Sequence, residues 1–276
     1  MQKPPPINFL SALALLGLAA GLGTYFYGYI SKSDPLMANA SIVVPGVSFV
    51  VLLLLLRQVE QPIKAILGLA ALYCLLWSLG NFGFTYLPFG DSSQGLIWAD
   101  YVYYLAYFCL MAASIVALVR FLPQDSSEDL PLYLLLGLLG AALVPVAFHY
   151  ASGIAHFEGS KTFYARFSYL FDTSMLVPNG MSALFFALVA LWNSGGWRSK
   201  VFGLLALTAL GNMIADTGYA AMRDTWYYGH WTDIVWVIQL SLPALAALLP
   251  ANAAASEHMG TVSSLERRGY EQAVDI

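Results

Sequence analysis

Residues 63–87 read IKAILGLAALYCLLWSLGNFGFTYL, and this stretch decides the fold class. Its charge is confined to Lys64 near the start, and about 20 mostly apolar residues are enough for a helix to cross the hydrocarbon core of a bilayer. We therefore interpret it as a membrane-spanning helix. By the same rule, seven more stretches are predicted to span the membrane or nearly do so, at about residues 8–30, 37–56, 97–121, 130–150, 166–193, 200–222 and 232–250.

The composition of the whole chain agrees with this interpretation. Of 276 residues, 59% are hydrophobic and 10% are charged, whereas soluble domains carry about 45–50% apolar and about 25% charged residues. A soluble enzyme and a disordered chain are therefore excluded. The balance of 12 Lys and Arg against 16 Asp and Glu leaves no basic surface for nucleic acid. We predict an all-α fold, a polytopic membrane helix bundle of about eight spans in a lipid bilayer.

One transmembrane domain, residues 1–250, is expected to precede a polar cytoplasmic tail, residues 251–276. The first span follows Lys3, and we expect it to be retained; cleavage as a signal peptide would leave seven helices. Lys and Arg are retained on the cytoplasmic side of membrane proteins. Eight spans with a cytoplasmic N-terminus place eight of the 12 Lys and Arg residues inside and four outside. Both termini are therefore expected in the cytoplasm.

Several polar side chains interrupt the predicted spans. Such groups are costly in a membrane and tend to face the bundle interior or a water-filled cavity, so they are the first candidates for a functional site. In the expected topology Asn81, Asp172 and Asp216 each lie on the order of 9 Å from the outer end of a span. The inner halves of the same spans are almost entirely Leu, Ala, Val and Gly. The polar chemistry is therefore predicted on the outer side.

Three spans also combine a carboxylate with an aromatic ring about one helical turn away. In the span 97–121, Asp100, Tyr103 and Tyr107 share one helix face, and the spans 200–222 and 232–250 repeat the pattern. Rings supply apolar area and carboxylates supply hydrogen bonds or charge, which suits an amphipathic or cationic ligand. The predicted ligand-binding residues are Asn81, Asp100, Tyr103, Tyr107, Asp172, Asn212, Asp216, Tyr219, Asp233 and Trp236.

Structural alternatives exist for these residues. Asp100 and Asp233 stand near helix starts, where helix capping explains a carboxylate at least as well as ligand binding does. Asp172 and Asp216 could pair internally with arginines in the adjoining loops. Aromatic residues at span ends are more typical of a belt at the membrane surface than of a site. This group comprises Tyr86, Trp98, Tyr101, Trp226, Tyr227, Tyr228 and Trp231.

The chemistry of cofactors and catalysis is not indicated by the sequence. The lysines all lie at or near loops, so none suits a retinal Schiff base, and the histidines are too peripheral to hold haem. Two cysteines cannot form a cysteine-based zinc site. A zinc site of His149, His156 and Glu158 is a minor alternative. Without a nucleophile, phosphate-loop or metalloprotease motif, we predict no cofactor, no metal and no enzyme activity.

Two groups of residues at predicted outer helix ends form a recognisable pattern. Trp77-Ser-Leu-Gly-Asn81 is followed by Ala99-Asp-Tyr-Val-Tyr-Tyr-Leu-Ala-Tyr107, and Ala215-Asp-Thr-Gly-Tyr219 is followed by Asp233-Ile-Val-Trp236. Over residues 63–250 this pattern resembles the N-terminal membrane sensor regions of bacterial signalling proteins with GGDEF or EAL domains. The resemblance implies a sensory multi-helix domain in the bacterial inner membrane. Residues 251–276 hold no cyclase, phosphodiesterase or kinase domain, so a protein partner is expected to supply the output.

The leading prediction is a membrane sensor or signalling-type module. It would bind a small ligand in the outer half of the bundle and act through a cytoplasmic or membrane partner. The alternative from another class is a non-catalytic accessory or structural subunit of a larger membrane protein complex. A transporter ranks third, because nothing polar continues through the inner halves of the spans.

Overall fold

The computed structural model describes residues 9–87, 98–121, 137, 140, 174–222 and 227–250. Regular structure within these residues is helical throughout. Six of the described helices are long and apolar enough to cross a membrane, which confirms the predicted multi-pass helical bundle. The elements are α1 (Phe9–Ser31), α2 (Asp34–Leu55), the short 3-10 helix η1 (Leu56–Gln58), α3 (Ile63–Tyr86), α4 (Trp98–Phe121), α8 (Leu176–Trp192), α9 (Trp197–Met222) and the helix Trp231–Pro250, here called helix 231–250.

Most predicted spans agree with these helices to within three residues at each end. The predicted span 166–193 differs, because α8 begins at Leu176 and residues 166–173 lie outside the described part of the chain. Pro178 stands in the first turn of α8, where its missing N–H would have had no intrahelical acceptor. The predicted span 130–150 lies outside the described residues, apart from Gly137 and Gly140.

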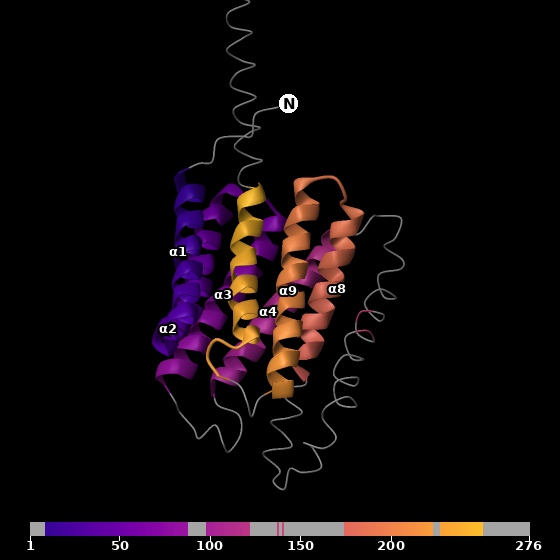
Figure 1. The fold of residues 1–276 in the computed structure, drawn as a ribbon. Coiled ribbons are helices and arrows are strands. Elements are labelled where there is room, and N and C mark those ends of the chain that lie inside the picture. The colour runs from indigo at the N-terminus through magenta and orange to yellow at the C-terminus, as the bar shows by residue number, and fades with distance from the viewer. Residues whose placement is uncertain are drawn as a thin grey trace, which may run out of the picture.

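The helices pack as neighbours in the pairs α1–α2, α2–α3, α3–α4, α4–α8 and α8–α9. Helix 231–250, yellow in Figure 1, lies between the α1–α3 side of the bundle and α9. The Ser48 hydroxyl of α2 donates to the Leu240 carbonyl of this helix at 2.7 Å. In the most apolar 18-residue stretch of each helix, 61% of the residues are buried in helix 231–250 and 28% in α1, so helix 231–250 is the better enclosed of the two.

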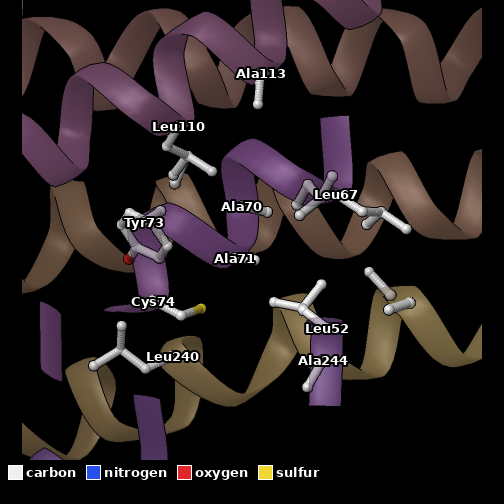
Figure 2. Packing of buried hydrophobic residues seen from close by; sticks show 14 of the residues in the cluster. Leu52, Leu67, Ala70, Ala71, Tyr73, Cys74, Leu110, Ala113, Leu240 and Ala244 are labelled. Carbon is white, nitrogen blue, oxygen red and sulfur yellow. The ribbon is translucent and has the colours of Figure 1, made fainter. Parts of the chain in front are cut away.

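Small side chains allow the helices to approach closely in the core. Figure 2 shows Ala70 and Ala71 of α3 between Ala113 of α4 on one side and Leu240 and Ala244 of helix 231–250 on the other. All five are at most 1% exposed. In a membrane, where lipid is as apolar as leucine, such close packing supplies much of the attraction between helices.

The chain enters and leaves the described bundle at the same end. Figure 1 shows the start of α1 and the end of helix 231–250 together at the upper end. A chain that crosses a membrane an even number of times has both of its ends on the same side. The predicted eight spans require the same arrangement. The assignment of that end to the cytoplasm stays a prediction.

Candidate ligand-binding cavity

Four helix ends meet at the lower end of the bundle in Figure 1: the end of α3, the start of α4, the end of α9 and the start of helix 231–250. These helices, together with α1, α2 and the start of α8, line a cavity of about 140 Å³. Eight of its 18 lining residues are aromatic, and three others carry carboxylates. The cavity is therefore the natural place to look for the predicted site.

Eight of the ten predicted ligand-binding residues line this cavity. They are Asn81, Asp100, Tyr103, Tyr107, Asp216, Tyr219, Asp233 and Trp236. Asn212 is fully buried and bonds to residues outside the lining, and Asp172 lies outside the described residues. The structure thus brings together side chains from four helices that the sequence pattern had grouped only by depth and helix face.

Asp216 is the most extensively bonded carboxylate of the group. Its Oδ1 accepts from the Tyr107 hydroxyl at 3.1 Å and from the Trp236 indole N–H at 2.9 Å. Its Oδ2 accepts from the Asn179 amide at 3.0 Å. One side chain therefore links α9 to α4, α8 and helix 231–250, through hydrogen bonds that a charged acceptor strengthens. The alternative pairing with Arg166 or Arg223 falls on residues outside the described part of the chain.

Asn81 makes a second link, between α2, α3 and α4. Its amide donates to the Ser41 carbonyl at 2.6 Å, and its oxygen accepts from the Tyr103 hydroxyl at 2.7 Å. The Tyr103 ring lies directly against Gly80, where any Cβ would overlap the ring atoms. Gly80 therefore lets Tyr103 reach Asn81, which explains a glycine next to the polar residue.

Trp77 stands at the centre of the aromatic wall. Its ring centroid lies 4.7 Å from that of Tyr103 and 6.1 Å from that of Trp236. Trp77 is 4% exposed and Tyr25 is 1% exposed, yet the Trp77 N–H and the Tyr25 hydroxyl have no hydrogen-bond partner among the described residues. Each unpaired buried group costs about 1–3 kcal/mol. Both residues belong to the wall of the cavity.

Next to the cavity, on the side nearer the middle of the bundle, three polar side chains form a closed ring of hydrogen bonds. The Asn212 amide donates to the Tyr73 hydroxyl at 2.7 Å, which in turn donates to the Gln239 oxygen at 3.0 Å. The Gln239 amide completes the ring by donating to the Asn212 oxygen at 2.7 Å. All three side chains are at most 2% exposed. The Tyr73–Asn212–Gln239 ring therefore joins α3, α9 and helix 231–250 on the side of the cavity nearer the middle of the bundle.

Asp233 bonds to the loop before its helix and is not the N-cap residue that the sequence left open. It stands in the first turn of helix 231–250, and its Oδ2 accepts the Gly229 N–H at 2.9 Å, from a residue that precedes the helix. Gly229 has φ of 85°, and a Cβ there would come within 3.0 Å of the Met37 sulfur. Asp233 also lines the cavity, and Asp100 combines a place in the first turn of α4 with the same lining.

Some residues of the site escaped the sequence argument. Tyr73 and Trp77 precede Asn81 at steps of four on α3, a pattern that one more application of the helical repeat would have found. Asn179 is a fully buried amide that was not among the predicted site residues. Tyr228 was assigned to the surface belt, but it lines the cavity, and burial raises the pKa of its phenol above the ordinary value.

Other belt assignments agree with the structure, since these side chains are exposed at the helix ends. They are Tyr86, Tyr101, Tyr227 and Trp231. Among the described residues, no group of three or more His, Cys, Asp or Glu is placed to hold a metal ion. The minor zinc alternative falls on residues outside the described part of the chain.

Comparison of the chain with family models, with curated proteins and with solved structures gave no match. The resemblance to sensor regions of signalling proteins therefore stays a prediction, and the function is argued from the cavity itself.

Proposed function

We propose that this protein is a membrane sensor or signalling-type module that binds a small ligand in the cavity and acts through a partner. The observation that carries the proposal is the pair of buried, unpartnered polar groups, on Trp77 and Tyr25, in the wall of one cavity. In the expected topology this cavity opens toward the outer side of a bacterial inner membrane, where it would sample ligands outside the cytoplasm.

Helix 231–250 is the element best placed to transmit the bound state. A single face of this helix contacts the site, because four of its residues line the cavity at spacings of three, one and three. They are Asp233, Trp236, Val237 and Leu240. The opposite end of the helix lies at the far end of the bundle (Figure 1). A ligand shifts a conformational equilibrium only through contacts that differ between the two states. If helix 231–250 moves, the contacts along its cavity face differ between the two states, as this shift requires.

Asp216→Asn tests the proposal. The substitution keeps the size of the side chain and leaves an oxygen for the Tyr107 and Trp236 donors. The new amide would face the Asn179 amide, but Asn179 can rotate its own oxygen toward it, because that oxygen has no partner among the described residues. We therefore expect Asp216→Asn to fold while it changes ligand occupancy, measured by mass spectrometry of small molecules that co-purify from native membranes.

Two results would contradict the proposal. One is a folded Asp216→Asn protein with the same co-purified molecules and the same partner complex as the natural protein. The other is purification of the natural protein without any bound small molecule but in a stable stoichiometric complex, which would favour the accessory-subunit alternative. Glu60→Gln is a matched control, since Glu60 is exposed and precedes α3 at the opposite end of the bundle.

A further inference from the structure

The wall of the cavity carries a specific combination of chemistry. Aromatic side chains from α3, α4, α9 and helix 231–250 surround it, and its described lining includes three carboxylates and no lysine or arginine. Asp100, Asp216 and Asp233 come from three different helices, so the acidic side chains of the lining are not confined to one helix end.

The aromatic rings meet at inclined angles rather than in a parallel stack. The planes of Trp77 and Tyr103 meet at 45°, those of Trp77 and Trp236 at 48°, and those of Tyr219 and Trp236 at 53°. All four of these residues line the cavity. Aromatic cages that recognise ammonium groups use the negative faces of such rings, with tryptophan as the most effective.

We propose that the ligand is a small organic ammonium ion that also carries an oxygen acceptor. This inference rests on the proposed function, because it names the chemical class of molecule for the same cavity. The ammonium group would lie against the rings and the carboxylates. The Trp77 N–H is a donor only and has no partner among the described residues, and the ligand oxygen would accept from it once the side chains that cover this atom move aside.

The size of the cavity limits the ligand. An engineered protein cavity of about 150 Å³ holds benzene, and the cavity here measures about 140 Å³. A molecule of about six to eight non-hydrogen atoms therefore fills it. Larger quaternary amines and extended polyamines would not enter without movement of the helices.

The experiment compares three probes of nearly the same shape on the full chain in lipid nanodiscs by isothermal titration calorimetry. The probes are choline, its neutral carbon isostere with a tert-butyl group in place of trimethylammonium, and the carboxylate of that isostere. We expect choline to bind at least about tenfold more tightly than either, because a buried cation–π contact alone supplies a factor of this order. Binding of the isostere as tightly as choline, or no binding by any probe, would overturn the inference.

Two variants locate the interaction. Trp77→Phe keeps an aromatic ring at this position, but it removes part of the indole together with the unpartnered N–H, and we expect it to weaken choline about threefold to tenfold. Asp100→Asn should weaken choline and leave the neutral isostere unchanged. Trp197→Phe at the start of α9 and Asp34→Asn at the exposed start of α2 are the controls, and both should bind as the natural protein does. Unchanged choline affinity in both cavity variants would place the binding elsewhere and refute the assignment.

The failure of this inference is distinguishable from failure of the proposed function. A neutral or acidic molecule that co-purifies with the natural protein and is lost from Asp216→Asn would refute the ammonium class while the sensor proposal stood. Absence of any co-purified molecule together with unaltered Asp216→Asn behaviour would refute the sensor proposal itself.

Discussion

Removing the Tyr73–Asn212–Gln239 ring altogether should cost clearly less than the summed losses from breaking it at each of its three members. In Gln239→Met the side chain keeps its length and loses both polar groups. The Asn212 oxygen then loses its donor and the Tyr73 hydroxyl loses its acceptor, in positions where both residues have no exposed surface. Each member of the ring is thus a hydrogen-bond partner of the other two. The effects of substitutions at the three positions on the free energy of unfolding should therefore be coupled.

The magnitude follows from the number of groups left unpaired. A buried polar group without a partner costs about 1–3 kcal/mol in soluble proteins, and a hydrogen bond between membrane helices contributes about 0.6 kcal/mol on average. Two groups lose a partner in Gln239→Met, so we expect a loss of about 2 kcal/mol in the free energy of unfolding. Asn212→Leu, which keeps the branched shape, should cost a similar amount.

The triple variant Tyr73→Phe, Asn212→Leu, Gln239→Met removes every polar atom of the ring and leaves none unpaired. It should therefore cost clearly less than the sum of the three single variants, with a coupling of about 1–3 kcal/mol. The measurement is unfolding in mixed detergent micelles of rising sodium dodecyl sulfate content, followed by far-ultraviolet circular dichroism.

Thr208→Val is the control for this series. Thr208 is fully buried in α9, but its hydroxyl donates to Leu204 of the same helix, so its removal strands no group on another helix. It should cost well under half of the loss in Gln239→Met. Additive effects of the three ring substitutions, or an equal loss in Thr208→Val, would refute the argument that the ring couples three helices.

Two further outcomes are expected. Gly229→Ala should destabilise the protein by about 1–2 kcal/mol, because φ of 85° is unfavourable for alanine and the Cβ would meet Met37; thermal unfolding measures this, and an unchanged midpoint would contradict it. Reporter fusions at Lys3 and after Ile276 should both report the cytoplasm, as the distribution of Lys and Arg predicts. A periplasmic signal from the second fusion would overturn that topology.

The sequence predicted the depth and the helix face of the polar residues, because both depend only on position along a helix. Asp100, Tyr103 and Tyr107 share a face by spacing alone, and the structure places all three in the cavity wall. Which partner each side chain meets depends on the rotation and tilt of neighbouring helices, which spacing does not encode. The bond from Tyr103 to Asn81 could therefore not be predicted, although both residues were selected.

The contributions from α1 and α2 illustrate a different limit. Tyr25 and Met37 line the cavity, but neither carries a charge, and an uncharged residue in an apolar span gives no signal of its own. Asn179 does give such a signal, as an amide in a predicted membrane span, but it was not among the predicted site residues. The bond from Asn179 to Asp216 shows that amides deserve the same weight as carboxylates in this kind of search.

The arrangement of polar groups favours sensing over transport. A solute that crossed the bundle from the cavity would have to pass the ring, where three mutually hydrogen-bonded side chains join α3, α9 and helix 231–250. Beyond it, the buried side chains between α3, α4 and helix 231–250 include Leu67, Ala113 and Ala244, all without exposed surface. The hydroxyl of Ser114 donates to its own helix there, so it offers a solute no replacement for lost water. A conformational signal needs no such path, because a shift of helix 231–250 at its cavity face moves the far end of the same rigid element.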